Sequence, residues 1–308
     1  MGGLPVTARL ALDLGARELR LLEADGRQLT RHAEVLLPEG TLADGMPTPL
    51  LTAAIRGAID SGGFSAVDAR VAIAETGTAY RDFGLPPLPP SELSRAVMFE
   101  GRRLIPMEAA DVYYAWHAER ESSGFAVYLV AARRDMIDAV VAALAGAGLR
   151  VDRMDLKPLA LARGVGTVDG LILEWGAVEA TLVLMVRGRP RFFRTFQVDA
   201  PPDNVEAQLD ELAMSLNALV KFMRGAAPDI SIGPSTTLAL AGRFAFIEEG
   251  LRRAQERFAF TVTLPATTLR VPLGLPWQAH LAGIGLLEQE RWRNRLTPSQ
   301  GGDIRVAA

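Results

Sequence analysis

The chain contains no cysteine among its 308 residues, which excludes disulfides, thiolate metal sites and cysteine nucleophiles. It also lacks a run of about 18 or more apolar residues, so we expect no membrane-spanning helix. Residues 1–5 have neither the basic region nor the long apolar core of a signal peptide. We therefore expect a cytoplasmic protein that meets a membrane only through a partner.

Charge and motifs remove further classes of function. The formal net charge is −3, so no basic field favours nucleic acid. The three histidines lie far apart in the sequence and in no metal-ligand spacing, so we assign no metal site. Neither a G-x-S-x-G elbow nor a G-x-x-x-x-G-K-[ST] loop occurs, which leaves hydrolase and P-loop interpretations without support.

What the chain does contain is a segment that occurs twice, 161 positions apart (176 minus 15). Each copy is an apolar strand that ends in an acid, Asp13 or Glu174, followed two residues later by Gly15 or Gly176. A second strand and a hairpin follow in both copies. Glycine tolerates tight turns and lets a ligand approach the main chain. The pair of turns therefore indicates a duplicated, two-lobed fold of the kind that holds nucleotide phosphates between its halves.

Local patterns predict alternating strands and helices, which is typical of an α/β fold. Residues 8–37 are expected to form a three-stranded meander, and residues 85–90, with four prolines, an extended connector before an insert. Hydrophobic periodicity and capping residues predict the helices. These are expected at 49–62, 91–105, from Asp135 to Leu144, at about 203–224, 246–258 and 277–293.

Several stretches, taken in order, resemble the type IV pilus assembly protein PilM, an actin-like protein related in fold to the division protein FtsA. They are Leu12–Gly15 with Arg20, Leu85–Leu93, Phe99–Glu100, Leu104–Met107, Tyr128–Arg133, Gly146–Leu149, Met154–Arg163, Glu174–Ala177 and Leu240–Gly242. Together they cover nearly all of the chain. The resemblance implies an actin-like, ribonuclease H-like two-lobed fold with an inserted subdomain of the FtsA/PilM type, named 1C.

The same resemblance implies a division into subdomains. Residues 1–80 and 155–167 would form subdomain 1A, residues 81–154 the α/β insert 1C, and residues 168–295 the second lobe, 2A and 2B. Residues 296–308 are expected to be a disordered tail.

For function, the resemblance implies a cytoplasmic scaffold, peripheral to the inner membrane, that serves type IV pilus assembly and twitching motility. It would bind the tail of a PilN-like membrane protein in a groove between 1A and 1C and link it to the pilus motor ATPases. We expect partner contacts from Phe99, Arg103, Tyr113, Tyr114 and Trp116. The last three alternate along a strand that is either a peptide-binding edge or an ordinary half-buried strand. The oligomeric state stays open.

The resemblance also implies a nucleotide site at Asp13, Gly15, Arg20, Glu174, Gly176 and Gly242. Phosphate turns commonly offer hydroxyl groups, but Ala16 and Arg17 follow the first glycine here, and Val178 and Glu179 lie in the second turn. Glu179 would bring a carboxylate toward a polyphosphate, which is a like-charge contact. We therefore predict a degenerate site where ATP with Mg²⁺ binds weakly or not at all.

Two alternatives stay open. An actin-like ATPase or phosphotransferase would bind and turn over ATP, and it needs hydroxyls in the turns and a catalytic acid. A GspL-like cytoplasmic domain of a type II secretion platform shares the fold, although such proteins normally continue into a membrane helix. The turn residues favour a protein that is not an enzyme over an ATPase or a phosphotransferase.

Overall fold

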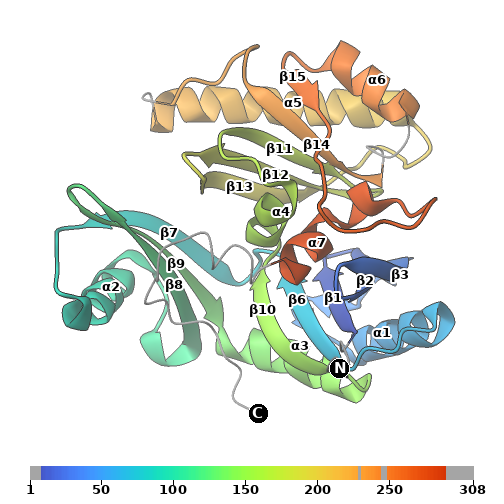
Figure 1. Ribbon diagram of the computed structural model, residues 1–308, viewed down its shortest axis with the longest axis horizontal. Coiled ribbons are helices and arrows are strands. Elements are labelled where there is room, and N and C mark those ends of the chain that lie inside the picture. The colour runs from blue at the N-terminus through green and yellow to red at the C-terminus, as the bar shows by residue number, and fades with distance from the viewer. Residues whose placement is uncertain (1–7, 228–229, 244–247, 289–308) are drawn as a thin grey trace, which may run out of the picture.

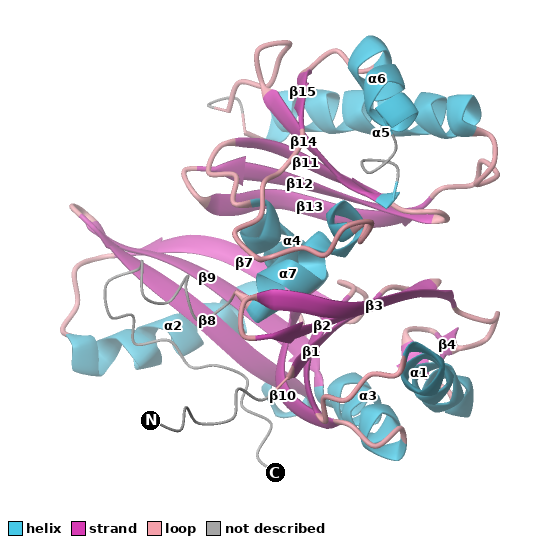
Figure 2. Cartoon of the chain, turned by 45° about the vertical axis from the view of Figure 1, so that its right-hand side comes forward, coloured by secondary structure: helices cyan, strands magenta, loops and turns pink. Residues whose placement is uncertain are grey.

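A computed structural model describes residues 8–227, 230–243 and 248–288 of the chain. Two five-stranded sheets form the centres of two stacked lobes, and a three-stranded sheet extends sideways from the lower lobe (Figure 1). Helices lie above the upper sheet, between the two sheets and below the lower sheet (Figure 2). The α/β class predicted from the sequence is confirmed.

The first lobe is built on a sheet with the order β10-β6-β1-β2-β3. Its strands are β1 (Arg9–Leu14), β2 (Glu18–Asp25), β3 (Gln28–Leu36), β6 (Asp68–Ile73) and β10 (Arg150–Leu156). The first three form the predicted antiparallel meander, and the last two run parallel in the same sheet. A short hairpin of β4 (Leu42–Ala43) and β5 (Met46–Pro47) precedes the first helix.

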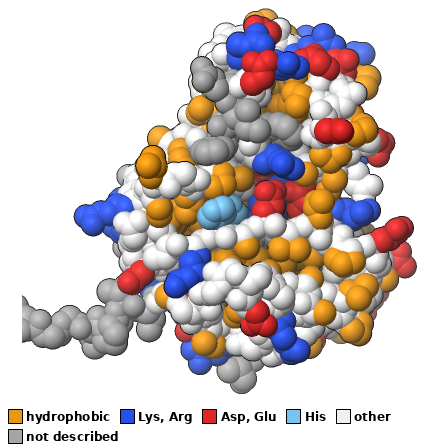
Figure 3. Space-filling model, turned by 90° about the vertical axis from the view of Figure 1, so that its right-hand side faces the viewer, with side chains coloured by type: hydrophobic (Ala, Val, Ile, Leu, Met, Phe, Trp, Pro, Cys, Tyr) orange, Lys and Arg blue, Asp and Glu red, His pale blue; other side chains and the backbone are white. Residues whose placement is uncertain are grey.

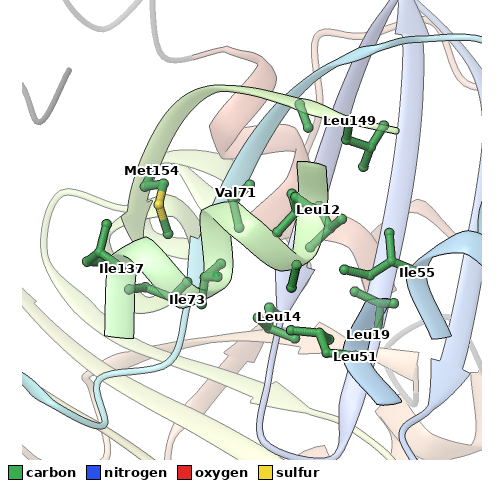
Figure 4. Close-up of a cluster of buried hydrophobic side chains, with 14 of the residues drawn as sticks. Leu12, Leu14, Leu19, Leu51, Ile55, Val71, Ile73, Ile137, Leu149 and Met154 are labelled. Carbon is green, nitrogen blue, oxygen red and sulfur yellow. The ribbon is translucent and has the colours of Figure 1, made fainter. Parts of the chain in front are cut away.

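Two helices, α1 (Pro49–Gly62) and α3 (Arg134–Gly146), cover the outer face of this sheet. As predicted, α1 begins after Thr48, whose hydroxyl accepts a hydrogen bond from Leu50 N. Apolar side chains of both helices meet those of β1, β6 and β10 (Figure 4). Full burial of each such leucine or isoleucine contributes about 1.5 to 3 kcal/mol, so this face closes a stable core.

The second lobe repeats this topology with the order β13-β12-β11-β14-β15. Its strands are β11 (Gly170–Trp175), β12 (Glu179–Val186), β13 (Arg189–Gln197), β14 (Thr237–Gly242) and β15 (Thr261–Thr263). Again three strands are antiparallel and two are parallel to the first. Helices α5 (Val205–Ala226) and α6 (Glu248–Arg257) lie over its outer face. The internal repeat seen in the sequence is therefore a repeat of whole sheets.

Two further helices, α4 (Lys157–Val165) and α7 (Leu281–Leu287), lie between the sheets (Figures 1 and 2). A Cβ added to Gly164 would lie 1.9 Å from the carbonyl oxygen of Leu281. One added to Gly285 would lie 1.8 Å from the carbonyl oxygen of Ala160. Only glycine lets the two backbones approach so closely, and this contact joins the lobes.

The small sheet has the order β7-β9-β8 and consists of β7 (Thr78–Leu85), β8 (Val112–Glu121) and β9 (Gly124–Arg133). Helix α2 (Pro90–Leu104) covers one face of it, and a short 3-10 helix (Ala109–Asp111) precedes β8. This small sheet with α2, residues 78–133, is named the insert below.

The insert therefore differs from the predicted range of 81–154. It begins earlier, with β7, a strand that the sequence patterns did not predict. It also ends earlier, because α3 packs on the first core and β10 pairs with β6 in the first sheet. Residues 134–154 belong to the first lobe because the partner of β10 is a strand about 80 positions upstream, which no local pattern reveals.

Two predicted helix limits also differ. The helix expected from Asp135 to Leu144 is α3, which runs from Arg134 to Gly146, and Asp135 Oδ1 accepts a hydrogen bond from Met136 N inside its first turn. The helix expected at 277–293 is a 3-10 turn (Trp277–His280) followed by α7, which ends at Leu287. Residues 289–308, including the predicted tail, lie outside the described residues. None of the described helices is long and apolar enough to cross a membrane.

Candidate functional site

Two hairpin turns, one from each lobe, meet at the boundary between the lobes. The first turn, residues 15–17, joins β1 to β2, and the second turn, residues 176–178, joins β11 to β12. Their geometry is the same: Gly15 N donates to Glu18 O at 2.9 Å, and Gly176 N donates to Glu179 O at 3.0 Å. The two glycines predicted for phosphate turns thus begin equivalent hairpins.

Glu179, the first residue of β12, reaches from the second lobe to the first turn. Its Oε2 accepts hydrogen bonds from Ala16 N at 3.0 Å and Arg17 N at 3.2 Å. Its Oε1 lies 3.4 Å from Lys157 Nζ. A Cβ on Gly15 would lie only 1.8 Å from this Oε1, so the glycine leaves the room that the carboxylate needs against the main chain.

Glu18, the first residue of β2, makes the equivalent contact in the opposite direction. Its Oε1 accepts hydrogen bonds from Ala177 N at 2.7 Å and Val178 N at 2.8 Å, and its Oε2 pairs with the Arg20 guanidinium. A Cβ on Gly176 would lie 2.8 Å from this Oε2. Each turn is therefore filled by a carboxylate from the other lobe, and Glu18 and Glu179 are called the clamp glutamates below.

Two buried cations lie between the turns. Lys157, the first residue of α4, places Nζ 3.2 Å from Asp13 Oδ2 and 2.9 Å from Glu174 Oε2. Arg20 on β2 lies 3.6 Å from Asp13, 3.5 Å from Glu174 and 3.2 Å from Glu34. Asp13 and Glu174, the penultimate residues of β1 and β11, thus share both cations.

These contacts define a buried charge cluster in which every side chain is at most 3% exposed. Its members are Asp13, Glu18, Arg20, Lys157, Glu174 and Glu179. Four acids face two bases, so the formal charge with all groups ionised is −2. Such a cluster is a poor receptor for a polyphosphate, because the cations are already paired and the surplus charge repels the ligand.

The acids of the cluster respond to their burial. The pKa of Asp13 is raised to about 6, chiefly by burial and with a smaller contribution from the Glu174 carboxylate, whereas Lys157 and Arg20 oppose the rise. Burial also raises the pKa of Glu18, against the attraction of Arg20. For Glu174, burial is outweighed by the two cations, and its pKa is lowered.

For the two bases, burial acts to lower the pKa, but the neighbouring carboxylates outweigh it. Burial by itself would lower the pKa of Lys157, but the carboxylates of Asp13, Glu174 and Glu179 raise it well above its usual value. Arg20 is likewise raised, against its burial, by the surrounding carboxylates. His280, which lies beside His32 with ring centroids 5.3 Å apart, has its pKa lowered to about 3 by burial and is neutral. The positive charge at the site is therefore that of Lys157 and Arg20, both held by acids.

The structure brings five of the six predicted nucleotide-site residues together in or beside this cluster: Asp13, Gly15, Arg20, Glu174 and Gly176. Gly242, the sixth, ends β14 next to Trp175, with φ +92°. A Cβ there would lie 2.2 Å from Trp175 O, so the main chain of the neighbouring strand already accounts for this glycine.

Sequence reasoning missed Lys157 and the contacts of the clamp glutamates. Each glutamate lies three residues after the glycine in its copy of the repeat, and this shared spacing could have indicated that the two side chains have equivalent roles. Gln208 on α5 was also missed. Its Nε2 donates to Ala177 O at 3.0 Å, and its Oε1 accepts from Trp175 Nε1 at 2.8 Å. Gln208 therefore connects α5 to the second turn and to the end of β11.

The predicted partner-binding residues lie on the insert but not on one surface. Phe99 on α2 is 70% exposed, and Arg103 on the same helix pairs with Glu100 at 2.7 Å. Tyr114 and Trp116 on β8 pack toward α2, whereas Tyr113 points to the other face and donates to Asp138 of α3 at 3.0 Å. The three aromatic side chains are half-buried, and β8 is an edge strand of its sheet.

The insert also contacts the second lobe through β13. Tyr80 on β7 donates its hydroxyl to Pro190 O at 2.9 Å and packs edge-on against Phe193 at 5.1 Å between ring centroids. Two ion pairs, Arg191 with Asp82 at 2.7 Å and Arg189 with Glu121 at 2.6 Å, lie beside this contact. The second lobe is therefore tied to the insert as well as to the first lobe.

On the face shown in Figure 3, acidic and basic side chains and a histidine gather at the boundary of the two lobes. A cavity of about 530 Å³ opens in the second lobe between the start of α5 and α6. Asp203, Glu206 and Glu249 line it with Arg253, which pairs with Glu206 and Glu249. This acidic lining does not suit an anionic ligand.

No family model matches the chain, and no curated protein matches it either. Solved structures do match in fold. A chain of a "PilM-PilN type IV pilus biogenesis complex" is 21% identical, with a TM-score of 0.71 over 92% of this chain and 99% of that one. The cytoplasmic domain of EpsL, an inner-membrane component of the type II secretion system of Vibrio cholerae, is 15% identical, with a TM-score of 0.54 over 91% and 95%.

The ethanolamine utilization protein EutJ from Carboxydothermus hydrogenoformans is 13% identical, with a TM-score of 0.52 over 92% of this chain and 90% of that one. The chain therefore has the two-lobed actin-like fold, as the sequence predicted. It shares its fold with the matched chain of the PilM-PilN complex over 92% of its length.

Proposed function

We propose that this chain is a non-enzymatic scaffold of a type IV pilus assembly platform. The similarity in fold to a chain of the PilM–PilN complex, over 92% of this chain, supports the pilus context. The observation that carries the non-enzymatic part is the contact of the clamp glutamates with both turns. An ATP polyphosphate would need the same N–H groups and the same cations.

The partner in this proposal is the cytoplasmic tail of a PilN-like inner-membrane protein, bound between the first lobe and the insert. An extended tail can add to a sheet edge, where main-chain hydrogen bonds give affinity and side-chain pockets give register. The edge strand β8 and the exposed Phe99 on α2 are suited to such a ligand. Arg103, Tyr113, Tyr114 and Trp116 are the further contacts that we propose.

The contacts between the insert and β13 suit a protein that transmits force. A tail bound at the insert would pull on the second lobe through Tyr80 and the two ion pairs, and on the first lobe through α3. In this role the protein would lie in the cytoplasm at the inner membrane and link the envelope part of the machine to its motor ATPases. Twitching motility would depend on it.

Calorimetry with a synthetic peptide of the PilN-like tail tests the proposal. The wild-type protein should bind the peptide, and Phe99→Ala should weaken binding by at least about tenfold, as expected for a central aromatic contact. Phe222→Ala removes another exposed phenylalanine, 56% exposed on α5, and should bind like the wild type. A folded wild-type protein that gives no binding heat would contradict the proposal.

A second candidate is the cytoplasmic domain of a type II secretion platform, which the similarity in fold to EpsL favours. The two functions differ in the partner, because a type II platform would select a peptide from its own secretion system. A competition between both peptides in the same titration distinguishes them.

A further inference from the structure

The coordination of the two clamp glutamates is the same in both directions. In each, one carboxylate oxygen accepts two consecutive backbone N–H groups of the opposite turn, and the other oxygen contacts one buried cation. All four carboxylate oxygens thereby have partners. A bound phosphate is held in the same manner, by consecutive backbone N–H groups of a turn and by a Lys or Arg.

The direction of these contacts matters more than their number. Glu18 belongs to the first lobe and binds the second turn, while Glu179 belongs to the second lobe and binds the first turn. Four hydrogen bonds to ionisable acceptors therefore cross the boundary between the lobes. In a nucleotide-binding protein with two phosphate turns, a polyphosphate between the turns makes this connection.

We infer that Glu18 and Glu179 are built-in anionic ligands that occupy both phosphate turns and hold the two lobes closed without a nucleotide. Closure is then a permanent property of the chain and does not depend on the supply of ATP. This inference rests on the non-enzymatic part of the proposed function, and it does not depend on the pilus partner.

Glu23 offers a matched control inside one lobe. It is fully buried, its Oε2 accepts from Ser65 N at 2.7 Å and Ala66 N at 2.8 Å, and its Oε1 pairs with Arg31. The local chemistry is that of a clamp glutamate, but β2 and residues 65–66 belong to the same lobe. Removing this carboxylate should cost local hydrogen bonds and leave the contact between the lobes intact.

Hydrogen exchange of the full chain tests the inference. Glu179→Ala should accelerate exchange in the first turn, in the other lobe, by at least about tenfold, since hydrogen bonds to charged acceptors are strong. Glu18→Ala should do the same in the second turn. Glu23→Ala should accelerate exchange at residues 65–66 and leave both turns as protected as in the wild type.

Two results would overturn the inference. One is a variant in which protection is lost only in the turn of the lobe that carries the substitution. The other is rapid exchange of the N–H groups of both turns in the wild type. Should an alanine variant fail to fold, Glu18→Gln and Glu179→Gln keep the side-chain length and one accepting oxygen. These variants should show the same crossed pattern with a smaller change.

Inorganic pyrophosphate tests whether the carboxylates lie where phosphates would bind. In the double variant Glu18→Ala/Glu179→Ala, two acids remain opposite Lys157 and Arg20, and the turn N–H groups lose their acceptors. Millimolar pyrophosphate should raise the Tm of this variant by several degrees and restore protection in both turns. It should not act on the wild type. A folded double variant that does not respond would overturn the assignment, and neither readout requires the peptide partner.

Discussion

Asp13 provides the sharpest pH-dependent prediction, because it is an acid held among charges from four elements. Its side chain is 3% exposed, and it faces Lys157 of α4, Arg20 of β2, Glu174 of β11 and Glu179 of β12. Burial raises its pKa to about 6 from the usual 3.8, so the folded protein holds this proton more tightly than the unfolded chain does.

The sign and size of the effect follow from that difference. Between pH 3.8 and 6 the folded state binds more protons at Asp13, so the free energy of unfolding falls as the pH rises. The contribution is fully present below pH 3.8 and is lost as the pH rises through 6. At 1.36 kcal/mol for each pH unit, the loss amounts to about 3 kcal/mol.

Urea unfolding of the wild type and of Asp13→Asn, measured between pH 4.5 and 8, isolates this residue. The neutral amide removes the titration, so the free energy of unfolding of Asp13→Asn should be at least equal to that of the wild type at pH 7.5. The difference between the variant and the wild type should fall by about 2 kcal/mol as the pH is lowered to 4.5, because the wild type gains stability there. Asp25→Asn makes the same change at an exposed aspartate at the end of β2, outside the charge cluster, and is the matched control.

One result would refute this reasoning. If Asp13→Asn were less stable than the wild type at pH 7.5 and the deficit shrank on acidification, attraction to Lys157 and Arg20 would exceed the cost of burial. The carboxylate would then stabilise the fold in its ionised form.

Three further predictions concern the same region. Lys157→Met should lower the free energy of unfolding, measured in urea, by about 3 to 5 kcal/mol, because the buried carboxylates lose the cation that they share. The control Lys221→Met, at an exposed position on α5, should change it by less than about 0.5 kcal/mol. A loss below about 1 kcal/mol for Lys157→Met would contradict the coupling described for the cluster. Gly15→Ala should cost about 1 to 3 kcal/mol, since its Cβ displaces Glu179 from its N–H partners. Gly57→Ala in α1, where an added Cβ meets no described atom within 4 Å, should stabilise by about 0.5 to 1 kcal/mol, and equal effects of the two substitutions would speak against the clamp. Millimolar Mg-ATP should leave the Tm of the wild type unchanged. A ligand that binds the folded state and is present at ~100 times its Kd would raise the free energy of unfolding by about 2.7 kcal/mol, so a clear rise in Tm would show that the site between the lobes binds nucleotide.

Much of the fold could be predicted from the sequence, because its signals are local. Thr48 before Pro49 and Gly63 after Gly62 give the two ends of α1, and the observed helix has those ends. The apolar stripe of α5 likewise predicted its buried face. Such elements depend on capping and periodicity within a few residues, which the sequence displays directly.

The limits of the insert could not be predicted in this way. Strand β7 contains Arg81 and Asp82 and is half-buried along most of its length, so it lacks the apolar alternation that marks a strand. Strand β10 resembles any short strand, and only its pairing with β6 assigns it to the first lobe. Pairing between distant strands is a tertiary property, and a local pattern does not contain it.

By itself, the sequence determined that the chain has two related halves, that each half carries an acid and a glycine turn, and that the turns lack hydroxyl groups. It also predicted that Glu179 would oppose a polyphosphate. Only the tertiary structure decided what the two glutamates do instead, because each carboxylate finds its N–H partners in the other lobe, more than 150 positions away. A side chain shows its charge in the sequence, but the groups that bind that charge are chosen by how the lobes pack.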